Sequence, residues 1–174
     1  MIVVAIVSLL AAIALPNFIN YSLRAKSAEA FTLMGSIITS QETFCAEFEN
    51  YVEVVPHPAS VPGVRKVPWN VIACPETCSR QNIADCNQFN CIGFQSPSAV
   101  YFQYTTSTIV AAQGVPPEYA LGAASDLNND GIPGTFAYRS ANYGGLVGLL
   151  HDGISLCATD MPAQSIIRCS PISY

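Results

Sequence analysis

Charge is what this sequence most lacks. Only 11% of its 174 residues are charged, 12 acidic and 7 basic, against about a quarter in an ordinary soluble domain. Seven lysines and arginines spread along the chain make no basic patch of the kind that a phosphate backbone needs, so the charge predicts no nucleic-acid contact. Hydrophobic residues make up 51% of the chain, which excludes a disordered protein.

The first 23 residues contain no charged side chain at all. Met1 to Leu15 reads MIVVAIVSLLAAIAL, with Ser8 as its only polar side chain, and Arg24 is the first charged residue. A membrane-spanning helix needs about 20 mostly apolar residues, a length reached if the run continues through Pro16 to Leu23. Basic residues follow the run instead of preceding it, which favours a retained anchor over a cleavable signal peptide. A buried helix of a soluble core is the alternative.

Glycine is also missing from the front of the chain, where Gly35 is the first. Beyond Arg24, apolar residues recur at helical spacing, which predicts an amphipathic helix that ends at Asn50, before a proline cluster. The two parts form one helix of about 50 residues, roughly 75 Å long. The apolar stripe comprises Phe31, Met34, Ile38, Cys45 and Phe48, widened by Leu33, Ile37 and Phe44.

So long a helix cannot be buried by the rest of this chain. The apolar front half therefore needs lipid or copies of itself. Pro16 lies in this half, where it removes a backbone hydrogen bond and predicts a kink. The kink is either a flexible joint for repacking or an ordinary feature of a membrane helix.

The front of the chain, MIVVAIVSLLAAIALPNFINYSLRAKSAEA, resembles the N-terminal signature of type IV pilins and related pseudopilins, with ALPNF as its proline block. The resemblance implies an inner-membrane precursor that a prepilin peptidase cleaves. It then implies an extracellular homo-oligomeric filament, built by pilus assembly machinery, with the apolar helices at its centre. The implied filament-core and assembly residues are Met1, Ile2, Val3, Val4, Ile6, Val7, Leu9, Leu10, Ile13, Leu15, Pro16 and Phe18.

The sequence departs from the family pattern at its front end. The family's block begins a few residues earlier, with a Phe-Thr-Leu-Ile-Glu-Leu-like stretch that carries the cleavage site and one acidic residue. The sequence starts at Met1 and contains neither, so either its front is truncated or its mature end differs. The family's contact between that acid and a neighbouring N-terminus is therefore assigned to no residue here.

The rest of the chain predicts a connecting region, 51–98, rich in proline and cysteine, and a β-rich head, 99–174. We expect strands at Ala99 to Thr108, Glu118 to Ala124 and Thr135 to Ser140, and Trp69 as a packing aromatic. A likeness of this part to some bacterial pilin heads supports an antiparallel sheet on the helix. The expected fold is α+β: an apolar transmembrane or filament-core helix (1–23), its amphipathic continuation (24–50) and a small disulfide-bearing sheet head.

An acidic loop separates the last two expected strands. Asp126, Asn128 and Asp130, followed by Gly131, match the opening of a calcium-binding loop, D-x-[DN]-x-[DN]-G. The twelfth position, where a bidentate Glu belongs, is Ala137. Calcium is therefore an under-liganded candidate, and side chains that cap a tight turn are the alternative. We expect no other cofactor.

Seven cysteines indicate an oxidising compartment. Cys157 and Cys169 resemble the disulfide-bounded loop near the C-terminus of pilin heads, and we predict that this pair is bonded. The spacing from Cys74 to Cys91 bears a passing likeness to a zinc cluster, but an exported domain favours disulfides. Two bridges among the other five cysteines leave one thiol, with the pairing open: Cys45, Cys74, Cys78, Cys86 and Cys91.

No enzyme motif is present, because GxGxxG, P-loop, HExxH and nucleophile-elbow patterns are all missing from the sequence. His57 falls in a loop between two prolines, and His151-Asp152 with Ser155 carries no mark of an exposed nucleophile. The resemblance, with no enzyme motif beside it, implies a structural pilin subunit with a role in adhesion, surface motility or DNA uptake. A type II secretion pseudopilin and a monomeric membrane-anchored binding module are the alternatives.

Overall fold

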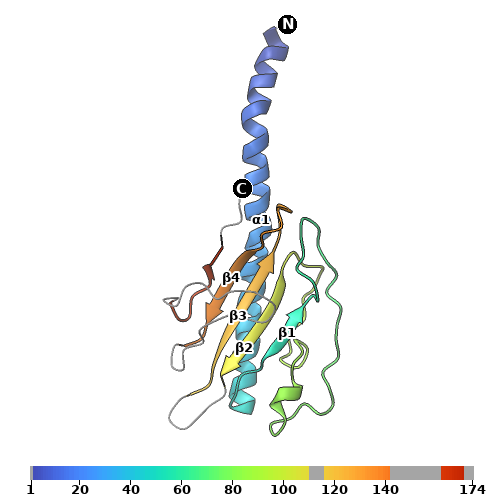
Figure 1. Ribbon diagram of the computed structural model, residues 1–174, viewed down its shortest axis with the longest axis vertical. Helices are drawn as coiled ribbons and strands as arrows, with labels where there is room; N and C mark the ends of the chain where they lie inside the picture. The colour runs from blue at the N-terminus through green and yellow to red at the C-terminus, as the bar shows by residue number, and fades with distance from the viewer. Residues whose placement is uncertain (1, 110–115, 142–161, 171–174) are drawn as a thin grey trace.

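The structure is a computed structural model that describes residues 2–109, 116–141 and 162–170. A long helix, α1 (Ile2–Phe48), packs with its second half on an antiparallel sheet and projects from the head with its first half (Figure 1). Among the described residues the sheet has five strands in the order β1-β2-β3-β4-β5. The α+β prediction of a long helix and a small disulfide-bearing sheet is confirmed. The strands are β1 (Val54–His57), β2 (Gln103–Ile109), β3 (Glu118–Ser125), β4 (Gly134–Arg139) and β5 (Ile167–Arg168), and a short 3₁₀ helix, η1 (Ile83–Asp85), precedes β2.

The sheet face of α1 is a narrow line of side chains that recur at alternating intervals of four and three, a spacing that keeps them on one side of a helix. The predicted stripe is offset from this line, because Phe31 is 46% exposed and Ile38 and Cys45 are half-buried. Two polar residues on the line explain the offset, since a search for apolar residues passes over them. The line consists of Leu23, Ser27, Ala30, Met34, Ile37, Gln41 and Phe44.

Ser27 and Gln41 are buried because their polar atoms find partners. The Ser27 hydroxyl donates back to the carbonyls of Leu23 and Arg24, each at 3.0 Å. The Gln41 amide donates to the Val52 carbonyl at 2.8 Å and accepts from the Val52 N–H at 3.1 Å. Gln41 thus fixes the chain where it turns back from α1 toward the sheet.

Strand β2 completes this polar cluster from the other side. The Thr106 hydroxyl donates to the Val52 carbonyl at 2.8 Å and accepts from the Val54 N–H at 2.9 Å. It also lies 3.3 Å from the Gln41 amide nitrogen. Helix, turn and sheet are therefore joined by hydrogen bonds inside the core, where an unpaired backbone group would be costly.

The helix ends two residues before the predicted Asn50. Glu49 has a φ of +60°, and its N–H donates to the Cys45 carbonyl at 2.8 Å. A residue in the left-handed region at this position is a common helix terminator. The turn, rather than the later prolines, thus stops α1. The helix α1 continues through Pro16 without a break. The kink expected at Pro16 stays a prediction.

Both faces of the central strands are buried. On the face toward α1, the Phe136 ring meets Phe31 of the helix at 5.0 Å between centroids and Phe102 at 5.7 Å. On the other face, small side chains such as Ala120 and Ala137 are fully buried as well. The expected alternation in β2 therefore separates two packed faces, and not a core face from a solvent face.

One strand prediction needs correction, and two strands were not predicted. The strand expected from Ala99 starts at Gln103, because Val100 instead forms an isolated bridge with Val67 of the connecting region. Strand β1 lies in that connecting region, and its Pro56 is tolerated because β1 is an edge strand. The β5 strand has two residues, too few for a periodicity to show.

We predict that Gln41→Leu destabilises the head by about 1–3 kcal/mol, because the Val52 N–H would lose its buried partner. The measurement is denaturant unfolding of the full chain in mild detergent, followed by far-ultraviolet circular dichroism. Ser36→Ala is the matched control, since Ser36 is exposed and bonds only within α1. Equal stability of Gln41→Leu and Ser36→Ala would contradict the role given to Gln41.

Candidate functional site

The candidate site is the bare half of α1. From Ile2 to Ile19 its large hydrophobic side chains are 54–77% exposed. An 18-residue window of α1 has a mean hydropathy of 2.6, and none of it is buried in the structure. By length and composition α1 can cross a membrane. A core helix of a soluble protein passes the same composition test, but it would be buried.

The predicted assembly residues all lie on this bare half, apart from Met1, which is outside the described residues. Every one of the others is exposed, and they occur on all sides of the helix, so no single stripe faces the head. The contacts that these residues make in a filament stay a prediction. Those on the bare half are Ile2, Val3, Val4, Ile6, Val7, Leu9, Leu10, Ile13, Leu15, Pro16 and Phe18.

Two disulfides hold the segment that follows the connecting prolines. Cys74 is bonded to Cys91, and Cys78 to Cys86. The Sγ atoms of Cys74, Cys78 and Cys91 lie within 4.8 Å of one another, so the segment whose spacing resembles a zinc cluster does bring three sulfurs together. In this oxidised form the four sulfurs are used in bridges, so no thiolate is available here as a metal ligand.

The remaining cysteines differ from one another. Cys45 is a free, half-buried thiol on α1, in the part of the helix that packs on the sheet. Burial raises the pKa of the Cys45 thiol, and a hydrogen bond with Tyr51 opposes this shift. Cys169 is disulfide-bonded, and its predicted partner, Cys157, lies outside the described residues, so the Cys157–Cys169 pair stays a prediction.

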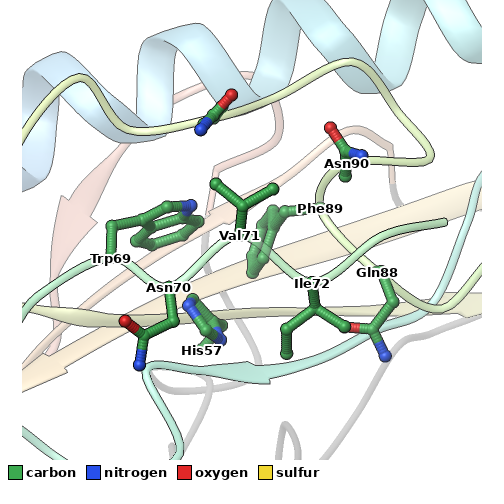
Figure 2. Close-up of a pocket in the computed structure, with 9 residues that line it drawn as sticks. His57, Trp69, Asn70, Val71, Ile72, Gln88, Phe89 and Asn90 are labelled. Carbon is green, nitrogen blue, oxygen red and sulfur yellow. The ribbon is translucent and has the colours of Figure 1, made fainter.

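His57 lies in an aromatic cluster and not in a loop (Figure 2). Its ring meets Trp69 edge-on at 4.5 Å, and Trp69 in turn contacts Phe89 at 5.3 Å. Burial lowers the pKa of the His57 imidazole, because the charged form loses solvation. The adjoining cavity is about 10 Å³, room for one water molecule. This geometry fits packing, as predicted for Trp69, and offers no space for a substrate.

The other histidine site considered from sequence cannot be placed. His151, Asp152 and Ser155 lie outside the described residues. Their arrangement as a catalytic group therefore stays untested.

The acidic loop uses its carboxylates on its own turn. The Asp126 oxygens accept the N–H groups of Asp130 at 3.1 Å and Gly131 at 3.0 Å. The Asp130 oxygens accept from Ile132 N–H at 2.8 Å and from the Asn128 amide at 2.7 Å. Gly131 has a φ of +81°, which suits a tight turn. The arrangement is that of side chains capping a turn, which was the alternative to the calcium candidate, and calcium binding itself is untested.

One curated relative is similar in sequence to about half of this chain. The chain is 37% identical over 86 residues to the type IV major pilin protein PilA of Myxococcus xanthus. The match covers 49% of this chain and 39% of that protein, so the chain spans less than half the length of its relative.

This likeness supports the type IV pilin family. The fold agrees with it, because a long apolar helix continues into a helix packed on a small antiparallel sheet with disulfides. No protein-family model matches the chain, and no solved structure matches it. The pilin relationship therefore rests on the resemblance of the first thirty residues, on the match to PilA and on the fold.

We predict one free thiol in each oxidised chain, at Cys45. The denatured but unreduced chain should take up one equivalent of maleimide, and peptide mapping should place it on Cys45. In the folded chain, labelling at neutral pH should be slower than for a free cysteine, because a raised pKa leaves less thiolate. Cys45→Ser should take up none, and uptake at another cysteine would contradict the pairing.

We predict that millimolar calcium leaves the thermal midpoint of the head unchanged, because the Asp126 and Asp130 oxygens already accept hydrogen bonds within the turn. Differential scanning calorimetry with calcium and with chelator measures this. A rise in the midpoint that Asp126→Asn abolishes would instead show a calcium site.

Proposed function

We propose that this chain is the structural subunit of an extracellular type IV pilus-like filament and assembles through the apolar half of α1. Before assembly the same half anchors the subunit in the inner membrane, and the assembly machinery draws it from there. The filament serves adhesion, surface motility or DNA uptake. The role is structural and not enzymatic, which agrees with the likeness to a major pilin.

The observation that carries the proposal is the exposure of the bare helix. Eleven large hydrophobic side chains between Ile2 and Ile19 are more than half exposed. Burying one such side chain fully is worth about 1.5–3 kcal/mol, so together they represent on the order of 10–30 kcal/mol. This is as large as or larger than the about 5–15 kcal/mol that typically stabilises a domain. A surface of this kind is stable only in lipid or against other apolar helices.

The shape of the molecule supports self-association over a single docking contact. The head lies at one end of α1 and leaves the other end bare all round (Figure 1). A helix that is apolar on every side can be surrounded by several equivalent neighbours. Lateral packing of such helices places the heads on the outside, which is the arrangement that a filament requires.

Two other roles are distinguished by one comparison. Long fibres of this chain in material sheared from cells support the pilus subunit. A type II secretion pseudopilin would give no such fibres, and deletion of the chain would block secretion. A monomeric anchored module would stay in the membrane without either effect.

We predict that Ala12→Lys abolishes fibre formation, because an unpaired ammonium inside an apolar bundle costs several kcal/mol. Electron microscopy and immunoblotting of the sheared fraction measure the fibre yield. The membrane fraction must be blotted as well, since the lysine also disfavours insertion. Gln81→Lys is the matched control, because Gln81 is exposed on the head. A normal fibre yield from Ala12→Lys would contradict the packing of α1 at the filament centre.

A further inference from the structure

We propose that the end of the head from which the bare helix emerges binds the headgroups of anionic phospholipids while the subunit is in the membrane. This proposal rests on the membrane placement given under the proposed function and adds the lipid class that this surface recognises. The surface is a basic collar made of Arg24 and Lys26 on α1 and Arg65 and Lys66 on the connecting segment.

The fold brings these two short segments together across about forty positions of sequence. The Lys26 ammonium lies 3.4 Å from the Val64 carbonyl oxygen. Lys26 and Lys66 both lie over the ring of Tyr101, at 5.2 and 4.9 Å from its centre. The collar therefore holds four of the seven lysines and arginines in the chain.

The collar lies at the height of a lipid headgroup. Ile2 to Leu23 contains no charge, and 22 helical residues rise about 33 Å at 1.5 Å each. The hydrocarbon core of a bilayer is about 30 Å thick. Arg24 and Lys26 are the first charges after this stretch, so they favour the headgroup layer at its end. The contacts of Lys26 and Lys66 with Tyr101 then place the connecting segment, with Arg65 and Lys66, at the same depth as Lys26.

Apolar side chains on the same rim suit an interface. Val64 is 47% exposed and Ile132, in the turn between β3 and β4, is 64% exposed. The turn is joined to the connecting segment by a hydrogen bond from the Asp126 N–H to the Pro62 carbonyl at 2.9 Å. Figure 1 shows this turn at the end of the head where the helix leaves. Exposed aliphatic groups beside cations are typical of surfaces that lie on membranes.

Among the described residues of the rim, acidic groups are fewer than cations. Glu29 forms an ion pair with Lys66 at 2.9 Å, and the carboxylates of Asp126 and Asp130 face the same rim and accept hydrogen bonds in their turn. The collar thus keeps a positive balance in a chain of net charge −5.

The opposite end of the head carries the acidic excess. There α1 ends among Glu42, Glu47 and Glu49, with Glu53 just beyond, and Arg80 is the cation that contacts this end, 3.9 Å from Glu49. A charge distribution polarised along the helix orients the basic end toward a negative lipid surface. The acidic end of a second subunit is the competing partner, and the test below includes it.

The test measures lipid selectivity at the protein boundary by electron spin resonance. The full chain is reconstituted into phosphatidylcholine vesicles that contain spin-labelled phosphatidylglycerol or spin-labelled phosphatidylcholine. We expect the motionally restricted fraction to show a several-fold preference for phosphatidylglycerol that falls as salt is raised. Arg65→Gln with Lys66→Gln should bring the preference close to one, because each cation near the surface contributes to it. Arg80→Gln, at the acidic end, should leave it unchanged.

The outcomes separate this proposal from the proposed function. Equal association of both lipids with the wild-type chain, beside normal fibres, overturns the lipid proposal alone. A double variant that keeps its lipid preference but loses fibres shows that the collar contacts a second subunit, and it also overturns the proposal. No restricted lipid of either class would show that α1 does not span, which contradicts the membrane step of the proposed function. The double variant should fold, because Lys66 is 38% exposed and the Glu29 carboxylate keeps its hydrogen bond from the Tyr101 N–H, and circular dichroism checks this.

Discussion

The structure depends on one imbalance: half of α1 has a partner in its own chain and half has none. The packed half contributes a line of side chains from Leu23 to Phe44 to the core of the head. The bare half is about as long as the packed half and apolar on every side, and the head covers none of its large hydrophobic side chains. Exposure of the bare half to water is unfavourable, and the head offers no surface that covers it. The chain therefore requires an apolar environment that it does not itself supply.

The head is built to keep the packed half in place. Gln41 joins the helix to the turn at Val52, and Thr106 joins that turn to β2. These bonds lie in the core, where they cannot be exchanged for bonds to water without unfolding. On the far side of the same turn, Tyr51 donates to Glu42 at 3.1 Å. The helix therefore emerges from the head in a fixed direction, as the proposed filament requires of each subunit.

Sequence reasoning found the parts whose signal is local. The apolar run, the amphipathic continuation and three of the strands each show in a few consecutive residues. It missed what depends on distant contacts or on very short elements: the buried roles of Ser27 and Gln41, the edge strand β1 with Pro56, and the two-residue β5. Cysteine spacing left the pairing open, because spacing alone does not distinguish the possible pairings of five cysteines. The fold decides the pairing by bringing particular sulfurs together.

The collar shows the same limit for the candidate site. Along the sequence its cations are two separate pairs in a chain with few basic residues, which argued against a patch of the kind that nucleic acid needs. In space Lys26 and Lys66 share the Tyr101 ring at the base of the bare helix. The first charged residues of α1 are thus also where the connecting segment contacts the helix. A single boundary, near Leu23, ends the uncharged stretch, begins the buried line and sets the level of the collar.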